Sequence, residues 1–551
     1  MTSAAPGPTL AGDDATRTCD AVIVGAGFSG LYMLHKLRGL GLTARVYEAG
    51  AGVGGTWYWN RYPGARVDIE SQEYSYSFSP ELDEEWVWSE RYASQPELLR
   101  YLNHVADRFD LRRDIQFDTR VTAAAFDEAT NRWTVTTDRG QTVRARYCIM
   151  ATGCLSVTNE PRFPGAGSFQ GKAYHTGRWP HEGVDFTGQR VGVIGTGSSA
   201  IQSIPQIAQQ ASQVYVFQRT PNFSVPAHNG PVDSKVAEDW KANRAQYRRE
   251  AREAGFGIRM VQHSEQCAMD ASPEERTSAY EERWARGGFA LAGAFADIIL
   301  DKAANDTAVD FVAGKIRSIV KDPAVAEKLV PTTYPIVTKR LCVDTGYYAT
   351  FNRDNVTLVD LKDEAIEAVT PAGLRTTKGD YALDSIVYAI GFDAMTGALA
   401  SIDIQGRGGA RLKDRWAEGP RTYLGLAIAG FPNLFIVTGP GSPSVLCNMA
   451  VAIEQHVEWI ADCIAYMGQR QLGAIEATVQ AQDAWVAHVN EVADATLYPQ
   501  ANSWYIGANI SGKPRVFMPY IGGFPAYRQA CEDVAANGYE GFALTSDARV
   551  G

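Results

Sequence analysis

The 551-residue sequence predicts an α/β protein with two Rossmann-like three-layer domains and a helical insertion in the second of them. A short apolar strand at residues 20–24 runs directly into a glycine-rich turn and a helix, and the same order recurs from residue 190. Residues from about 230 to 330 are instead rich in alanine, arginine, glutamate and lysine, which favours helices. At this length we expect several packed units.

The first unit carries the glycine loop of a dinucleotide site. Gly25 allows a tight turn, Gly27 lets the backbone approach a pyrophosphate, and Gly30 permits close packing of the helix on the strand. Glu48 ends the next strand, where a carboxylate accepts hydrogen bonds from both ribose hydroxyls of FAD or NAD. The intervening helix is predicted to be amphipathic from three leucines at helical spacing: Leu31, Leu34 and Leu37.

The second unit has the opposite ribose chemistry. Its strand ends in Arg219 and Thr220, a cation and a hydroxyl donor, where the first unit has an acid. A carboxylate there would repel a 2′-phosphate, whereas a guanidinium binds it bidentately, so this unit favours NADP over NAD. Together, the two units predict a flavin that is reduced by NADPH. The second loop presents Gly195, Gly197, Ser198 and Ala200.

Composition excludes several other classes of protein. The 52 basic and 63 acidic residues give a net charge of −11, which disfavours nucleic acid and anionic lipid as partners. We find no apolar run of 18 residues and therefore expect no membrane span. The eight cysteines contain no CxxC pair, so neither a metal site nor a thioredoxin-like centre is expected, and a reducing cytoplasm is the simplest location. Residues 1–18 are predicted to be a flexible tail.

Three further motifs carry a family resemblance. Phe169, Gly171, His175 and Trp179 fit the pattern FxGxxxHxxxWP just ahead of the second glycine loop. Residues 55–57 (GTW) precede YPG at 62–64 and then Asp68, and the stretch 501–524 is a third similar segment. In these motifs the chain resembles the type I Baeyer–Villiger monooxygenases. The similar segments run from residue 20 to about 530.

The resemblance implies roles for particular residues. Arg340 would lie over the flavin with Asp68 holding it, and Lys339 would support the NADP phosphate. Trp504 would bond the nicotinamide ribose through its indole N–H. The resemblance implies cofactor contacts for Thr56 and Trp57. It also places His175 and Trp179 at the cofactor interface, and it implies no proton-transfer role for His175. The loop expected to line the substrate pocket contains Ser444, Val445 and Leu446.

The implied reaction converts a hydrophobic ketone and O2 into an ester or lactone. NADPH would reduce FAD, and the reduced flavin with O2 would form a C4a-peroxyflavin that attacks the ketone carbonyl. Arg340 would stabilise both anionic species, and Asp68 would orient its guanidinium. The oligomeric state stays open, and a monomer is compatible with the sequence. The expected division is a tail at 1–18, an FAD domain at 19–150 and 390–551, an NADP domain at 151–225 and 335–389, and the insertion at 226–334.

Three alternatives share parts of this pattern. A flavin N- or S-oxygenating monooxygenase has both glycine loops, but its fingerprint typically lacks the Trp179-Pro180 ending and it does not need Arg340. A pyridine-nucleotide disulfide reductase needs CxxxxC soon after Glu48, and residues 50–70 contain no cysteine. A non-catalytic nucleotide-binding protein would have no reason to keep Asp68, Arg340 and Trp504 together.

Overall fold

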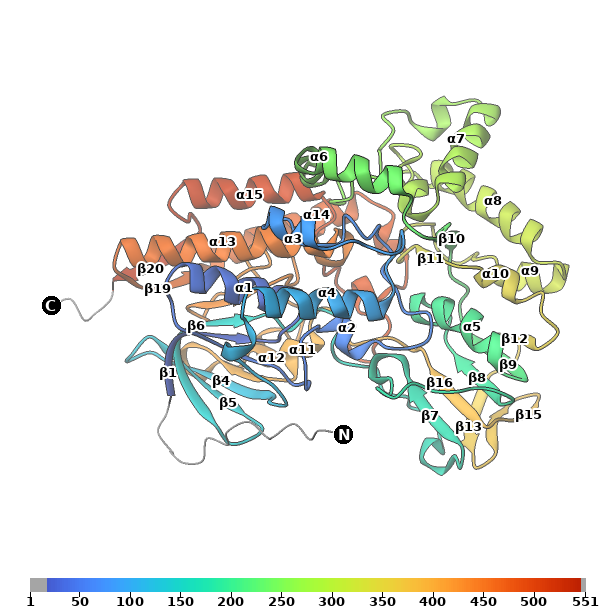
Figure 1. Ribbon diagram of the computed structural model, residues 1–551, viewed down its shortest axis with the longest axis horizontal. Helices are drawn as coiled ribbons and strands as arrows, with labels where there is room; N and C mark the ends of the chain where they lie inside the picture. Colours follow the sequence, from blue (N-terminus) through green and yellow to red (C-terminus); the bar gives the residue numbers. More distant parts are fainter. Residues whose placement is uncertain (1–16, 547–551) are drawn as a thin grey trace.

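The computed structural model describes residues 17–546 and builds them around two separate sheets (Figure 1). In the first sheet β1 pairs in parallel with β2 and β6, β18 pairs in parallel with β6, and β4 and β5 add an antiparallel extension. The strand order is β17-β4-β5-β6-β1-β2-β3. The strands are β1 (Arg17–Val24), β2 (Ala44–Tyr47), β3 (Ile115–Gln116), β4 (Val121–Asp127), β5 (Arg132–Thr137), β6 (Thr142–Met150), β17 (Asp403–Gln405) and β18 (Leu434–Ile436).

Burial along β1 explains why this domain is layered. Ala21 and Ile23 belong to the apolar core under α1 (Phe28–Gly39) and α13 (Met449–Gln469), whereas Val22 and Val24 belong to a second core against β4, β5 and β18. Successive side chains of a strand point to opposite faces, so an uninterrupted apolar run marks a strand that is covered on both sides. The predicted three-layer arrangement is confirmed for this domain.

The second sheet is parallel throughout and has the order β12-β9-β8-β16-β7. Helix α5 (Ser198–Gln210) follows β8 directly, as the repeated strand–loop–helix pattern predicted. The sheet lies beside the first one in Figure 1. Its strands are β7 (Lys172–His175), β8 (Arg190–Ile194), β9 (Gln213–Gln218), β12 (Val356–Asp360) and β16 (Ser385–Tyr388).

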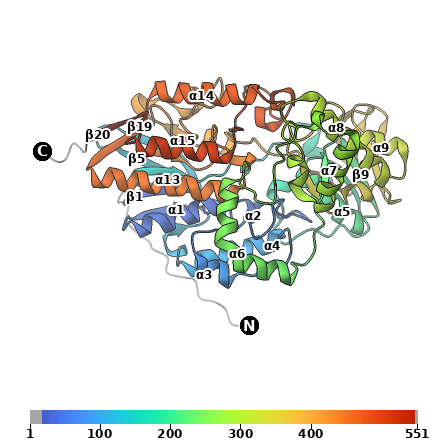
Figure 2. The same ribbon diagram turned by 90° about the horizontal axis from the view of Figure 1, so that it is seen from above.

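The predicted helical insertion is present between β10 (Ser224–Pro226) and β11 (Cys342–Asp344), which pair with each other in parallel. Figure 2 shows α6 extending from this region toward α3 (Pro80–Glu85), and Arg248 on α6 donates to Asp83 on α3. The insertion therefore contacts the first domain as well as its own. Its helices are α6 (Ser234–Glu253), α7 (Pro273–Arg286), α8 (Lys302–Ile319) and α9 (Pro323–Leu329).

Short elements complete the chain. The remaining helices are α2 (Thr56–Trp59), α4 (Gln95–Arg108), α10 (Tyr347–Thr350), α11 (Gly397–Ala400), α12 (Leu412–Arg415), α14 (Val479–Asp494) and α15 (Phe524–Ala536). The remaining strands form a meander, β13 (Ile366–Thr370), β14 (Gly373–Thr376) and β15 (Gly379–Ala382), and an antiparallel pair, β19 (Leu472–Ala477) and β20 (Phe542–Ser546).

Two expectations need correction. Arg17 and Thr18 belong to β1 and not to the predicted tail, and residues 1–16 lie outside the described part of the chain. Helix α1 is not amphipathic over its first half, because Phe28 to Leu34 are all buried where α13 covers the outer side. Over residues 17–546, every helix is too short or too polar to cross a bilayer.

Candidate active site

The first glycine loop is built so that backbone lies against backbone. Gly25 has φ +106°, and a Cβ there would lie 2.5 Å from the carbonyl oxygen of Ala151. A Cβ on Gly30 would lie 1.8 Å from the carbonyl oxygen of Gly25, so only glycine allows α1 to pack this closely on the loop. Gly27 faces Gly55, whose Cα would lie 3.3 Å from a Cβ on Gly27. A loop of bare backbone lets a pyrophosphate group approach its N–H groups.

Glu48 is 5% exposed and closes this loop from below. Its Oε2 accepts the N–H of Ala26 and its Oε1 accepts the N–H of Gly50, both at 2.7 Å. Burial raises the pKa of the Glu48 carboxyl, and these two backbone donors oppose that rise. Because each carboxylate oxygen accepts more than one hydrogen bond, the side chain keeps capacity for ribose hydroxyls while it shapes the loop.

The second glycine loop leaves more space. Gly195 has φ +114°, and a Cβ there would lie 2.3 Å from the carbonyl oxygen of Ala389, so this glycine is required by the fold. A Cβ on Gly197 would meet no described atom within 4 Å. The chain itself therefore gives no packing reason for glycine at position 197, whereas a ligand that approaches the start of α5 does.

Two cations gather at the end of β9. Arg219 is exposed, and Lys339 is half-buried with its Nζ 4.2 Å from the centre of the Tyr334 ring. Burial, with added repulsion from Arg219, lowers the pKa of Lys339 to about 8. Two mutually repelling cations fit an anionic group such as a 2′-phosphate. The hydroxyl of Thr196 in the glycine loop donates to the carbonyl oxygen of Thr220 at 2.7 Å, which ties the loop to the same strand end.

Asp68 and Arg340 form the central ion pair. Arg340 Nε donates to Asp68 Oδ2 at 2.9 Å and Nη2 donates to Oδ1 at 2.7 Å, a bidentate arrangement. The Nη1 group donates to the carbonyl oxygen of Val445 at 2.9 Å. Burial opposes the charge of Arg340, but the charge and hydrogen bonds of Asp68 outweigh it, so the pKa of Arg340 is raised. The side chains stay 25% and 24% exposed, which leaves part of the pair within reach of a ligand.

Contacts between the two domains place Asp68. The loop that carries it turns at Gly64, where a Cβ would lie 2.3 Å from the carbonyl oxygen of Gln202 on α5. The Tyr62 hydroxyl donates to Gln202 Oε1 at 2.8 Å, and Gln202 Nε2 donates to the carbonyl oxygen of Arg66 at 3.1 Å. A segment of the first domain is thereby docked on the helix that follows the second glycine loop. None of these interdomain bonds was visible in the sequence.

Arg340 is placed by the short strand β11. Cys342, two residues later, lies with its Sγ 3.3 Å from the hydroxyl oxygen of Ser198 at the start of α5. Val337, three residues earlier, has φ +72°, which is a strained conformation for a β-branched residue. Met395 and Ser444 also have positive φ angles, +66° and +43°. Such strain clusters at sites where the surrounding structure holds a chain for function.

The C-terminal segment supplies Trp504 and a residue that sequence analysis did not single out, Tyr505. The rings of the two lie 4.3 Å apart between centres. Burial raises the pKa of Tyr505 to about 12, and Arg340 opposes that rise through its charge and a side-chain hydrogen bond. The segment is held down by Lys513, whose Nζ donates to Asp393 Oδ1 at 2.5 Å. The sequence could have indicated Tyr505, because it directly follows the predicted cofactor contact Trp504.

The four fingerprint residues all have structural contacts within the chain. His175 ends β7, its Nδ1 accepts the N–H of Gly177 at 3.0 Å, and its Nε2 lies 3.1 Å from the carbonyl oxygen of Asn159. Burial lowers the pKa of His175, so the ring is neutral with both nitrogens bonded to backbone. Trp179 packs against Tyr174 and Phe186, Phe169 packs in the core of the second sheet, and a Cβ on Gly171 would lie 2.4 Å from the carbonyl oxygen of Asp384.

Thr56 and Trp57 begin the one-turn helix α2 beside the first glycine loop. Thr56 is exposed, whereas Trp57 is buried with its indole N–H donated to the Tyr74 hydroxyl at 3.3 Å. The exposed hydroxyl is therefore available to a ligand, and the tryptophan supports the helix from the inside. Both follow Gly55, which packs against Gly27 of the loop.

The three residues predicted to line the substrate pocket differ in access. Ser444 is fully buried and donates to the carbonyl oxygen of Thr438 at 3.2 Å, so it supports the turn and does not face an open pocket. Val445 offers its carbonyl oxygen to Arg340, and Leu446 keeps partial exposure. The two belong to an apolar cluster that also contains Met449.

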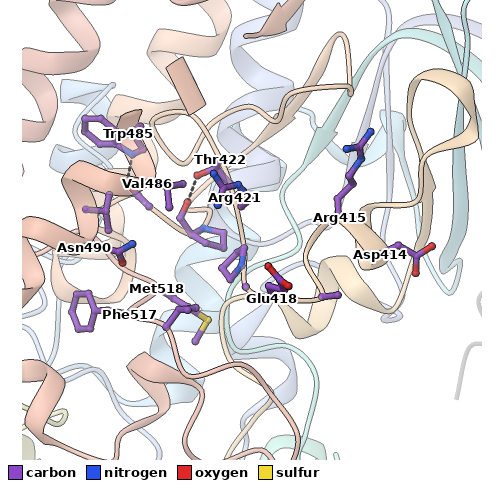
Figure 3. A pocket seen from close by; sticks show the side chains of 17 residues that line it. Asp414, Arg415, Glu418, Arg421, Thr422, Trp485, Val486, Asn490, Phe517 and Met518 are labelled. Carbon is purple, nitrogen blue, oxygen red and sulfur yellow. Dashed lines mark hydrogen bonds between the residues drawn. The ribbon is translucent and has the colours of Figure 1, made fainter. Parts of the chain in front are cut away.

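A cavity of about 440 Å³ lies behind the start of this loop (Figure 3). Thr422 donates to the carbonyl oxygen of Pro440 at 2.6 Å, and Trp485 donates to that of Gly441 at 3.0 Å. The residues that line the cavity include Met518 but not Asp68, Arg340 or the three predicted pocket residues. It therefore adjoins the back of the loop and is separate from the ion pair.

Two glycine loops with ribose partners of opposite charge, joined through the Asp68–Arg340 pair, define a flavoprotein that combines a flavin with a pyridine nucleotide. Residues 22–277 match a family model described as pyridine nucleotide-disulphide oxidoreductase. A Baeyer-Villiger monooxygenase from Pseudooceanicola batsensis is 46% identical over 94% of this chain and 95% of its own length. A phenazine N-monooxygenase from Lysobacter antibioticus is 44% identical over 96% of this chain and 97% of its own.

A solved structure titled oxidized steroid monooxygenase bound to NADP is 56% identical, with a TM-score of 0.92, and the match covers 96% of this chain and all of that one. The chain belongs to the Baeyer–Villiger monooxygenase family, and the resemblance drawn from its motifs is confirmed. The disulfide reductase alternative lacks its redox pair, because no cysteine lies between residues 50 and 70. The matching family model reflects the shared two-nucleotide fold.

Proposed function

We propose that the chain is an FAD- and NADPH-dependent monooxygenase that inserts one oxygen atom of O2 beside a ketone carbonyl to give an ester or lactone. The observation that carries this is the bidentate Asp68–Arg340 pair, held where the two nucleotide-binding domains meet. FAD would bind along the loop of Gly27 and Glu48, and NADPH along the loop of Gly197 with its 2′-phosphate at Lys339. Bound FAD, reduced by NADPH, supplies the activation of O2.

Arg340 acts as an electrostatic stabiliser of the oxygen-transfer step. A guanidinium has five N–H donors, and Asp68 and Val445 occupy three of them. The others remain for Tyr505 and for an anionic oxygen in the site. When the ketone carbonyl is attacked, its oxygen gains negative charge, and a preorganised cation beside it lowers the barrier.

Asp68 keeps the guanidinium in position and balances its charge. A cation largely removed from water costs roughly several kcal/mol without a partner, so the carboxylate makes it possible to hold Arg340 where its side chain is only 25% exposed. Its two parallel bonds also hold one edge of the guanidinium, which sets its direction within the site. Asp68 and Arg340 therefore function as one unit.

The substrate class is a hydrophobic ketone. Leu446, Met449, Phe256 and Ile299 are partly buried apolar residues that pack around the cluster containing Val445 and Tyr505. Apolar residues beside Arg340 would favour apolar ketones, since a hydrophobic ligand gains roughly 25 cal/mol for each Å² removed from water. The eight cysteines are all free thiols, which suits a reducing cytoplasm.

N-oxygenation is the second candidate, because one relative is named a phenazine N-monooxygenase. The two functions separate in one assay: enzyme, NADPH and air with a panel of cyclic, aryl-alkyl and steroid ketones and of heteroaromatic amines, analysed by mass spectrometry. Ester or lactone formation with a mass gain of one oxygen supports the proposal. Oxidation of the amines alone, with all ketones unchanged, would replace it by N-oxygenation.

A further inference from the structure

Phe289 lies in the helical insertion, far from Arg340 in sequence, yet its ring covers the guanidinium. Arg340 Cζ is 4.7 Å from the ring centre, within the range of a cation–π contact. The bonds from Arg340 to Asp68 and Val445 lie along the edges of the guanidinium, so they limit its sliding within its plane but not its tilt out of that plane. We propose that Phe289 is a positioning residue that holds the face of Arg340 and thereby aims its remaining N–H groups.

The turn before Phe289 is built to fix the ring. Gly287 and Gly288 have φ +76° and +58°, a left-handed pair that only glycine adopts easily. A Cβ on Gly287 would lie 2.5 Å from the carbonyl oxygen of Pro226, and a Cβ on Gly288 would lie 2.2 Å from the hydroxyl oxygen of Tyr92. The turn is therefore pressed against two neighbours, and Phe289 has little freedom to move away.

The same short segment that supplies Asp68 also anchors this turn. Glu70, two residues after Asp68, accepts two hydrogen bonds from Arg91 at 2.9 and 2.7 Å. Arg91 Nη2 also donates to the carbonyl oxygen of Arg286 at 3.0 Å, at the end of α7 and three residues before Phe289. Edge contact and face contact on Arg340 are thus tied to one loop, and a shift of the loop moves both.

This arrangement assigns a mechanical task to the insertion. Two edge contacts leave a guanidinium free to tilt out of its plane, and the ring removes that freedom on one side. The ring also excludes water from that face of the guanidinium. A lower local dielectric constant strengthens the attraction between Arg340 and an anion in the site. Hydride transfer needs no such charge. Loss of the ring is therefore expected to impair oxygen transfer and to leave flavin reduction unchanged.

The activity test, which rests on the proposed function, compares Phe289→Leu, Phe289→Tyr and a control, Phe295→Leu. Phe295 is buried in the same insertion beside Tyr280 and does not touch Arg340 in the described contacts. Phe289→Leu should lower the ratio of ester formed to NADPH consumed by about 3- to 30-fold, the range of one cation–π contact. Phe289→Tyr and Phe295→Leu should keep the ratio within about two-fold. An unchanged ratio in Phe289→Leu would overturn the proposal.

Thermal unfolding tests the contact itself, whatever the substrate. Phe289→Leu and Arg340→Met are measured alone and together. If the ring acts through the guanidinium, the double variant should have nearly the Tm of Arg340→Met alone, because the shared contact is lost only once. Additive Tm losses would show that Phe289 only fills space and would refute the positioning role. A wild-type protein that oxygenates no ketone would instead remove the proposed function and leave this result standing.

Discussion

Arg340 and Asp68 are 272 positions apart in the chain and meet through two parallel hydrogen bonds of 2.9 and 2.7 Å. The guanidinium precedes a strand at the end of the helical insertion, and the carboxylate follows a Pro-Gly turn of the first domain that is docked on α5. Both residues are thus placed by segments that contact α5, at the start of which the second glycine loop ends. The two bonds form only when both segments are in place, so the ion pair depends on the assembled fold.

Arg340→Ala should separate the two halves of the reaction. NADPH should still bleach the flavin without air, because hydride transfer does not require the guanidinium. Ester formation should fall by about 10²–10³-fold, the usual loss on removing one preorganised donor. NADPH consumption would then release hydrogen peroxide. The measurement is the ratio of ester to NADPH, with the surface variant Arg375→Ala as control, and a ratio near the wild-type value in Arg340→Ala would disprove the role.

Asp68→Ala should behave as a weaker copy of Arg340→Ala. It loosens the guanidinium but leaves the Val445 contact and the positive charge. We expect a loss of ester formation that is about ten-fold smaller than in Arg340→Ala. Asp68→Glu, which restores a carboxylate, should recover part of the ratio. If Asp68→Ala proves more damaging than Arg340→Ala, the carboxylate has a role other than holding this arginine.

The lowered pKa of Lys339 predicts that NADPH binding depends on pH. Its lowered pKa, about 8, means that the ammonium is present below that pH and is lost as the pH rises through it. The 2′-phosphate is fully ionised there, so NADPH binding to the free enzyme should weaken above pH 8, by about ten-fold for one charge-assisted contact. NADH binding should not change. In Lys339→Arg, whose charge persists, the profile should become flat, and a wild-type profile in that variant would argue against Lys339.

Arg219→Ala tests the origin of the NADPH preference. One charge-assisted hydrogen bond is worth roughly 1.5–3 kcal/mol, so NADPH should bind about 10- to 100-fold more weakly while NADH hardly changes. Fluorescence titration of each nucleotide gives both dissociation constants. Arg190→Ala, at the opposite end of the adjacent strand β8, serves as control. An equal loss for both nucleotides would show that Arg219 does not contact the 2′-phosphate.

The glycine loops predict opposite outcomes for two alanine substitutions. Gly30→Ala places a Cβ 1.8 Å from a backbone oxygen, so the protein should unfold at lower temperature and lose FAD. Gly197→Ala meets no described atom within 4 Å, so its Tm should stay within a few degrees while NADPH binds more weakly. Thermal unfolding and nucleotide titration decide both. A strongly destabilised Gly197→Ala protein would show that this glycine serves the fold.

The sequence alone determined the fold class and the positions of two glycine loops, and it predicted a chemistry for each ribose site. These features are local: a strand, a glycine turn and a helix occupy adjacent residues, and the charge that ends the next strand lies about 24 positions on. The family motifs extended this to Asp68, Arg340 and Trp504. The wrong prediction that α1 is amphipathic arose because local leucine spacing could not show that the distant helix α13 covers its outer side.

Tertiary structure alone decided what surrounds Arg340. The contacts from Asp68, Val445, Phe289 and Tyr505 come from four separate segments, and no spacing along the chain relates them. It also showed that Ser444 is turned inward, because its turn has a positive φ and a hydroxyl bonded to backbone. Local pattern follows from backbone geometry and neighbouring residues, whereas the environment of a charge depends on which distant segments the packed domains bring against it.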